Sequence, residues 1–166
     1  MRRKTFLTLS LLAAAALVGL DQLLKYWAVL RLRPAGDIQL LPQVLHLQYR
    51  ENFGAAFSIL QNQTFLLVGV TSAVLLAILA GLLLGKVRPY PLIAAFSLIL
   101  AGGVGNLIDR IGRGYVVDYI YFVPIDFPVF NLADCCVVIG TGLALLYFFL
   151  IEPRQGRREE RTTADG

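Results

Sequence analysis

The stretch FLLVGVTSAVLLAILAGLLLG, residues Phe65–Gly85, carries no charged side chain over its whole length. A helix needs about 20 predominantly apolar residues to cross the hydrocarbon core of a bilayer. The stretch therefore predicts a transmembrane helix. Three more apolar runs meet or approach this length, and the four predicted spans cover residues 6–24, 65–85, 92–108 and 130–151.

The composition of the whole chain of 166 residues agrees with a membrane protein. Hydrophobic residues make up 57% of it and charged residues only 16%, with a mean hydropathy of +0.69. Soluble domains carry about 25% charged residues, and disordered chains combine low hydrophobicity with high charge. Both classes are therefore excluded. We expect one domain over residues 1–152 and a basic tail over residues 153–166.

The first apolar run has an alternative interpretation. Arg2, Arg3 and Lys4 precede it, as basic residues precede the apolar region of a cleaved secretory signal. Three later spans make the chain polytopic in either case, and the run continues through Asp21 and Lys25 into further apolar sequence. We therefore interpret it as a retained transmembrane helix.

The positions of Lys and Arg predict the orientation in the membrane. Nine of the 15 basic residues fall before the first span, between the second and third spans, or after the fourth. Positive residues favour the cytoplasmic side, so both termini and the loop between the second and third spans are expected there. The net charge of +4 has the same explanation. No nucleic-acid partner is expected, because no aromatic platform accompanies the basic residues.

Residues 31–63 form a long external segment between the first two spans. Within it VLHLQYREN, residues 44–52, alternates apolar and polar side chains with the period of a half-buried strand. AAFSIL, residues 55–60, is apolar enough to lie along the membrane surface, and residues 112–129 form a second external stretch. The expected fold is an all-α membrane protein of four transmembrane helices with a small extracytoplasmic β-like or amphipathic segment.

Polar and ionisable residues gather near the outer ends of the predicted spans. Such groups are costly inside a membrane and are candidates for function. They come from four parts of the chain: Asp21 and Lys25; Asn106, Asp109 and Arg110; Asp118; and Asn131 and Asp134. A functional site is therefore expected at the outer boundary of the membrane.

The spacing of these residues predicts which of them meet. Asp21 and Lys25 are four residues apart with the acid first, the favourable order for an ion pair on a helix. The Asn and Asp of the third span, and likewise those of the fourth, are three residues apart and share a helix face. Gly102, Gly103 and Gly105 leave room for a neighbouring helix or for an extended peptide, and both interpretations stay open.

The residue types present narrow the chemistry. The only histidine, His46, lies in the predicted strand, and the adjacent Cys135 and Cys136 lack a metal-binding spacing. We therefore expect no metal and no cofactor. When two carboxyl groups are held close together, one keeps its proton and the other is ionised. The protonated group can polarise a carbonyl while the ionised group takes a proton from water, and together these two steps hydrolyse a peptide bond. The candidates for such a pair are Asp21, Asp109, Asp118 and Asp134.

A small transporter, or a proton or ion relay, is the alternative, because such proteins also use intramembrane carboxylates. Transporters place these groups near the bilayer midplane and usually show internal repeats. The gathering of the polar residues at one boundary, and the lack of a repeat in the sequence, favour the enzyme.

Five short motifs at these positions resemble those of the bacterial lipoprotein signal peptidases, signal peptidase II. They are DQLLK (21–25), NFGAAF (52–57), GGVGNLIDR (102–110), GYVVDY (114–119) and FNLAD (130–134), in the order that the family has. The match covers essentially the whole chain except the tail. Tyr119 departs from the Phe that is more common in the family, and the loop between Asp118 and Asp134 is short.

The resemblance implies an aspartic endopeptidase of the bacterial inner membrane, with its site near the extracytoplasmic face. The substrate would be a prolipoprotein whose cysteine already carries diacylglycerol, cleaved just before that cysteine. Membrane lipid and the cyclic peptide inhibitor globomycin are the other implied partners, and the catalytic dyad would be Asp118 and Asp134. The supporting and substrate-positioning residues would be Asn52, Gly54, Asn106, Asp109, Arg110 and Asn131, with Asp21 and Lys25 holding the outer end of the first helix.

Overall fold

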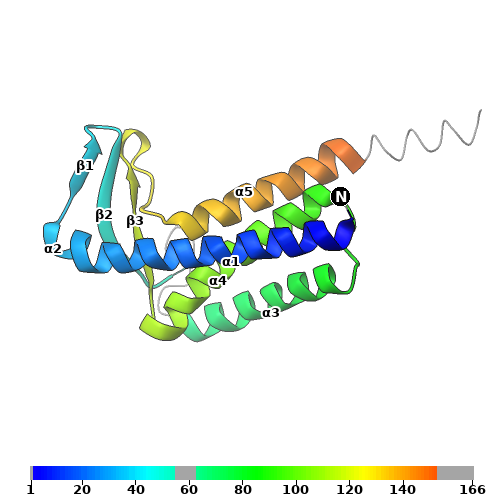
Figure 1. Ribbon diagram of the computed structural model, residues 1–166. Helices are drawn as coiled ribbons and strands as arrows, with labels where there is room; N and C mark the ends of the chain where they lie inside the picture. Colours follow the sequence, from blue (N-terminus) through cyan, green and yellow to red (C-terminus); the bar gives the residue numbers. More distant parts are fainter. Residues whose placement is uncertain (1, 55–62, 153–166) are drawn as a thin grey trace, which may run out of the picture.

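A computed structural model describes residues 2–54 and 63–152 (Figure 1). In this part of the chain, four helices are long and apolar enough to cross a membrane. They lie side by side, and a small sheet lies at the end of the bundle opposite the N-terminus (Figure 1). The apolar segment at 55–60 and the basic tail, for which we state expectations above, lie outside the described residues.

The first helix is longer than predicted. Its parts are α1 (Arg3–Trp27), a π-helical turn (Ala28–Leu32) and α2 (Arg33–Ala35). Residues 31–35, the start of the predicted external segment, are therefore helical and continue the first helix. The side chains of Ala28 and Leu32 are fully buried against Val117 and Tyr119 of the sheet. This packing stabilises the helix beyond residue 24, where the predicted membrane span ends.

The helix α4, which is the third membrane-spanning helix, lies at the centre of the bundle. The remaining spans are α3 (Thr64–Leu83), α4 (Tyr90–Arg113) and α5 (Leu132–Leu146), the last continued by a π-helical turn (Tyr147–Ile151). α4 packs against α1, α3 and α5, and it extends beyond the predicted span of residues 92–108 at both ends. Neighbouring helices supply partners for its polar side chains, so its outer turns remain helical.

Glycines on α4 let the neighbouring helices approach closely. A Cβ atom at Gly102 would collide with the backbone oxygen of Ala133 on α5, and one at Gly105 would lie 2.6 Å from Oδ2 of Asp21 on α1. These approaches support the helix-packing interpretation of the glycines. Gly103 in addition lines the cavity described below.

Three strands form an antiparallel sheet in the order β1–β2–β3. They are β1 (Ile38–Leu41), β2 (Leu45–Asn52) and β3 (Val116–Phe122). β2 confirms the strand predicted at residues 44–52. β3 comes from the second external stretch, so both connectors build the sheet, and the expectation of a β-like segment between the first two helices covers only part of it. The register places Asp118 opposite Arg50, two residues from the pairing of Val116 with Asn52.

The alternation predicted for β2 is wrong at His46. The side chain of His46 is buried, its Nδ1 lies 3.0 Å from Oδ2 of Asp37, and its ring packs edge-on against Tyr121. Leu47 and Tyr49 pack toward the buried cluster where the first helix meets the sheet. Both faces of the sheet are therefore partly covered, and a two-faced alternation does not describe it.

Candidate active site

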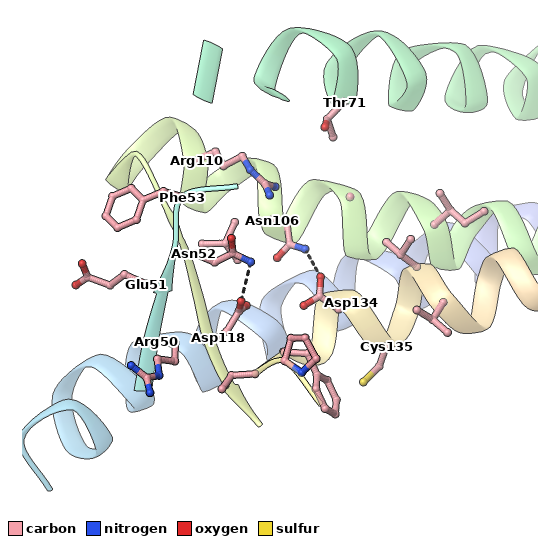
Figure 2. A pocket seen from close by; sticks show the side chains of 18 of the residues that line it. Arg50, Glu51, Asn52, Phe53, Thr71, Asn106, Arg110, Asp118, Asp134 and Cys135 are labelled. Atoms are coloured by element: carbon pink, nitrogen blue, oxygen red, sulfur yellow. Dashed lines mark hydrogen bonds between the residues drawn. The ribbon is translucent and has the colours of Figure 1, made fainter. Parts of the chain in front are cut away.

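A cavity of about 1010 Å³ lies where the sheet meets α3, α4 and α5 (Figure 2). Its polar end is lined by Asn52, Asn106, Arg110, Asp118 and Asp134. Its other end is lined by apolar side chains of α3, α4 and α5. The cavity thus connects a cluster of polar groups to an apolar surface of the kind that faces lipid.

Asp118 lies on β3, with its side chain buried at this polar end. Asn52 Nδ2 donates to its Oδ2 at 2.9 Å, and Asn131 Nδ2 donates to its Oδ1 at 2.6 Å. Burial, reinforced by the carboxylate of Asp134, raises the pKa of Asp118 to about 7, although the two amide hydrogen bonds oppose this shift. Asp118 can therefore hold or release a proton near neutral pH.

Asp134 lies in the first turn of α5, where a capping box holds it. Its Oδ2 accepts from the backbone N–H of Asn131 at 3.1 Å, while Asn131 Oδ1 accepts from the backbone N–H of Asp134 at 2.9 Å. Its Oδ1 accepts from Asn106 Nδ2 at 2.8 Å (Figure 2). Asn131 thus binds both carboxyl groups, Asp134 with its backbone and Asp118 with its amide, and fixes one relative to the other.

A buried ionic cluster lies behind the two carboxyl groups. The fully buried Nζ of Lys25 is 2.8 Å from Oδ2 of Asp21 and 3.2 Å from Oδ2 of Asp109, and it donates to Asn106 Oδ1 at 2.8 Å. Asp21 Oδ1 also accepts from the backbone N–H of Ala133 at 3.0 Å. The predicted ion pair Asp21–Lys25 is confirmed. It joins α1 to α4 and α5 rather than holding the outer end of the first helix, because that helix continues to residue 35.

Asp109 and Arg110 are adjacent in sequence but have separate partners. Asp109 is buried, accepts from the backbone N–H of Val117 at 3.1 Å and lies 3.4 Å from Nε of Arg113. Arg110 Nη2 donates to the backbone oxygen of Gly54 at 2.8 Å. Asp109 therefore connects α4 to the start of β3, whereas Arg110 connects α4 to the chain that follows β2.

Sequence reasoning missed four polar residues that line the cavity: Arg50 and Glu51 on β2, Thr71 on α3 and Cys135 on α5. Thr71 is a polar residue in an otherwise charge-free span, which is a weak signal; in the structure it points into the cavity (Figure 2). Cys135 is partly exposed and lines the cavity, whereas Cys136 is buried, and both thiols are free. Within residues 2–54 and 63–152, no group of three His, Cys, Asp or Glu side chains is placed to hold a metal ion.

The fold and the cavity define a class of protein: a multi-pass membrane protein that brings two buried carboxyl groups, each held by amide donors, to one cavity. Comparison with known proteins identifies the family. The model of the family described as signal peptidase (SPase) II matches residues 13–150 of this chain. The chain belongs to the signal peptidase II family.

Relatives and solved structures agree with this assignment. The lipoprotein signal peptidase of Brevibacillus brevis is 43% identical over 140 residues, which cover 84% of this chain and 93% of that protein. That of Streptococcus thermophilus is 42% identical over 134 residues, covering 81% and 88%. Two solved structures, both described as bacterial membrane enzymes, are similar with TM-scores of 0.79 and 0.77 and identities of 32% and 31%. The first similarity covers 85% of this chain and 87% of the other, and the second covers 87% and 94%.

Proposed function

We propose that this protein is a lipoprotein signal peptidase with an aspartic mechanism, in which Asp118 and Asp134 are the catalytic residues. Membership of the signal peptidase II family supports the removal of signal peptides from lipoproteins. The observation that carries the mechanism is the pair of buried carboxyl groups at one end of one cavity, joined through Asn131. The other members of the cluster hold or position these two.

The chemistry follows from one proton shared between two carboxyl groups. Two like charges in buried neighbouring groups repel each other, so one group keeps its proton. The ionised carboxylate takes a proton from water as the water oxygen attacks the scissile carbonyl carbon. The protonated carboxyl group donates to the carbonyl oxygen. Asn52, Asn106 and Asn131 hold the two groups in place during this step.

The apolar end of the cavity supports a substrate that is anchored in the membrane. Val70 and Val74 of α3 line it, as do Val138 and Ile139 of α5. Each of these four side chains has at least half of its surface exposed on the outside of the bundle. Acyl chains and a signal-peptide helix in the bilayer therefore have access from the side. We place the diacylglyceryl group of the prolipoprotein there and the peptide bond before the lipidated cysteine at the dyad.

Orientation and inhibition follow from the same arrangement. The loop between α3 and α4 lies at the opposite end of the bundle from the sheet (Figure 1), and its positive charges favour the cytoplasm. We therefore place the protein in the bacterial inner membrane with the dyad near the extracytoplasmic face. Globomycin is expected to inhibit cleavage by occupying the cavity in place of the substrate.

A cleavage assay tests the proposal. The purified full-length protein in detergent is mixed with a diacylglyceryl-modified prolipoprotein, and the product is followed by its shift on a gel. Wild type is expected to cleave, while Asp118→Asn and Asp134→Asn fold normally and lose at least about 10²-fold in rate. Asp126→Asn is the matched control, because Asp126 is exposed and binds Tyr121 away from the cavity. An inactive wild type, or normal cleavage by either dyad variant, would reject the proposal.

The alternative of a transporter or an ion relay is not supported. The family that matches is a peptidase family. The two carboxyl groups moreover lie beside the sheet at one end of the bundle, whereas transporters place such groups near the bilayer midplane.

A further inference from the structure

One amide in the site has an orientation that its neighbours determine. Lys25 Nζ lies 2.8 Å from Asn106 Oδ1, and an ammonium group only donates hydrogen bonds. The amide oxygen of Asn106 must therefore face Lys25. The NH₂ group of Asn106 must then face Asp134, where Nδ2 lies 2.8 Å from Oδ1. Asn131 Nδ2 also donates to Asn106 Oδ1, at 3.2 Å, which reinforces the same orientation.

Asp134 receives further stabilisation as an anion from α5. It lies in the first turn of that helix, and its Oδ2 accepts from the backbone N–H of Asn131. The N-terminus of a helix carries a partial positive charge, which favours a negative side chain. Both carboxyl oxygens of Asp134 thus face N–H donors, and one donor belongs to an amide that a buried ammonium polarises. All of these contacts favour the ionised form.

The surroundings of Asp118 favour its anion less. Asp118 lies on a strand, which has no comparable dipole. Its donors, Asn52 and Asn131, are neutral amides whose oxygens accept from the backbone N–H groups of Gly54 and Asp134. In spite of both donors, burial and the Asp134 carboxylate raise the pKa of Asp118 to about 7. Asp118 is therefore better suited than Asp134 to hold the shared proton.

We propose that Asp134 is the ionised member of the dyad and Asp118 the protonated one, and that Lys25, acting through the amide of Asn106, is the positioning residue that maintains this difference. The inference rests on the proposed function and deepens it, because it assigns the base, the acid and the group that separates them.

The assignment gives a balanced reaction. Asp134 takes a proton from water as the C–O bond forms, and Asp118 gives its proton to the carbonyl oxygen. When the tetrahedral intermediate collapses, the C–N bond breaks and Asp134 returns its proton to the departing nitrogen. Asp118 recovers a proton from a hydroxyl group of the intermediate, which leaves a carboxylic acid and an amine as products and restores the starting state of the dyad.

The other charged groups around the dyad do not by themselves explain why Asp134 is ionised and Asp118 protonated. The charged and titratable groups near the two carboxyls are Asp21 and Lys25 on α1, Arg50 and Glu51 on β2, Asp109 and Arg110 on α4, Tyr119 on β3 and Cys135 on α5. The facing span of α3 carries no charge. Arg110 acts on both carboxyl groups. The charge of Lys25 acts on both carboxyl groups as well, so what it gives to Asp134 alone is the contact through the Asn106 amide.

The pH dependence of kcat/KM on a diacylglyceryl-modified prolipoprotein tests the assignment. Its acidic limb reports the ionisation of the base, and its alkaline limb reports the loss of the proton from the acid. Asn106→Leu removes a donor to Asp134, so we expect its acidic limb to move up by about one pH unit with the alkaline limb unchanged. Asn52→Leu removes a donor to Asp118, so we expect the alkaline limb to move up instead.

Two results would overturn the assignment. One is the crossed result, in which Asn106→Leu moves the alkaline limb and Asn52→Leu the acidic limb. The other is a pair of profiles that keep both limbs in place while activity falls, which is the behaviour of residues that only support the fold.

Lys25→Met tests the role of Lys25 itself. Without the ammonium only Asn131 still donates to the amide oxygen of Asn106. The orientation of the amide is then held less strongly, so the acidic limb is expected to move in the same direction as in Asn106→Leu, by at most the same amount. The double variant of Lys25 and Asn106 is expected to move it no further, and an additive shift would contradict the role. Because Lys25→Met leaves the buried Asp21 carboxylate without its cation, Lys25→Met combined with Asp21→Asn provides a charge-balanced version.

Infrared difference spectroscopy gives a second reading that needs no turnover. In mildly acidic buffer, a protonated carboxyl band is expected that disappears in Asp118→Asn and remains in Asp134→Asn. The opposite pattern would overturn the assignment. Failure of the proposed function looks different, since the wild-type protein would then cleave at no pH, whereas failure of this assignment leaves wild-type cleavage intact.

Discussion

Asp118 couples the stability of the folded protein to pH. Burial, together with the neighbouring Asp134 carboxylate, raises its pKa from 3.8 to about 7. Between these two values the folded protein still binds a proton that the unfolded chain has released. Stability therefore falls as the pH rises through this range and is highest below it. One such group contributes a slope of up to about 1.4 kcal/mol for each pH unit.

Asp118→Asn is expected to remove this slope, because an amide does not ionise. The Tm of the variant in detergent should match that of wild type at low pH and exceed it above the raised pKa of about 7. Asp126→Asn serves as the control and should keep the wild-type slope, since Asp126 is exposed. A wild-type slope that persists in Asp118→Asn would show that another group is responsible.

Asp109 differs from the dyad in what its removal does. It is buried between Lys25 and Arg113 and accepts from the backbone of Val117. Asp109→Asn is expected to lower the free energy of unfolding by about 1–3 kcal/mol, because it removes one of the two carboxylates that contact the buried Lys25, and to lose only part of the activity. Denaturation in detergent and the cleavage assay, run on the same samples, check both effects.

The dyad itself is expected to behave as one unit. The double variant Asp118→Asn with Asp134→Asn should be little slower than either single variant, since residues that act together are not additive. Rates from the cleavage assay decide this. A well-folded but inactive Asp109→Asn, beside near-normal cleavage by Asp118→Asn, would instead assign the dyad to Asp109 and Asp134.

At the scale of elements, the sequence predicts the spans well where the membrane alone determines them. The predicted run 65–85 coincides within two residues with α3 (Thr64–Leu83), because bilayer thickness sets the length of an apolar helix that faces lipid. The first helix is different. Arg33, Pro34 and Gly36 suggest a loop, but packing of Ala28 and Leu32 on the sheet keeps the chain helical until Gly36, whose φ of 81° ends it.

The sheet and the contacts of the site show a second limit. The alternation of residues 44–52 predicts β2, but its partner β3 lies more than sixty residues away, and pairing over such a distance leaves no local signal. The same holds for the candidate site. Clustering at the ends of the spans predicts that the polar residues meet, whereas the contact of Lys25 with Asn106 depends on how closely α1 packs on α4.

The close packing of both α1 and α5 on α4 depends on glycines, and Gly102, which faces α5, makes this packing testable. Gly102→Ala is expected to lower the Tm and the yield of folded protein, because the new Cβ would collide with the backbone oxygen of Ala133 and push α5 from α4. Gly112→Ala on the same helix is the control. A Cβ there meets nothing within 4 Å, so Gly112→Ala should be neutral or stabilise by up to about 1 kcal/mol. Equal effects of the two substitutions would contradict the packing argument.

At the scale of the whole molecule, the bundle separates two environments. One end holds the sheet, the dyad and the ionic cluster, and the other holds the N-terminus and the loop between α3 and α4 (Figure 1). The cavity connects the polar end to apolar surfaces of α3 and α5. A peptide bond near the membrane surface and acyl chains within the bilayer can therefore occupy it together.

Cys135 can be used to measure whether a ligand occupies this cavity. Its thiol is partly exposed and lines the cavity, whereas the next residue, Cys136, is buried and provides an internal control. A maleimide is expected to label wild type and Cys136→Ser but not Cys135→Ser, and globomycin or substrate should protect the thiol. Cys135→Ser itself should retain turnover. Labelling that neither ligand slows would show that they bind elsewhere.

The orientation of the molecule in the membrane depends on which end faces the cytoplasm. Arg3 donates from Nη2 to the backbone oxygens of Leu82 and Val87, at 3.1 and 3.0 Å, so the N-terminal end of α1 and the loop that contains Lys86 and Arg88 lie together. Both parts are basic, and they carry the same preference for the cytoplasm instead of competing. The sheet lies at the opposite end (Figure 1).

Reporter fusions after Lys86 and after Arg158 are therefore expected to report the cytoplasm, and fusions after Gln39 and after Ile125 the extracytoplasmic side. Replacing the basic residues of the loop between α3 and α4 by glutamine should weaken this preference. The control is the cleavage rate of the purified variant in detergent, which should not change because the loop lies at the opposite end of the bundle from the dyad (Figure 1). If the unaltered loop reported the extracytoplasmic side, the dyad would lie at the cytoplasmic face. The carboxyl chemistry would be unchanged in that case, but the substrate would have to reach it from the opposite side of the membrane.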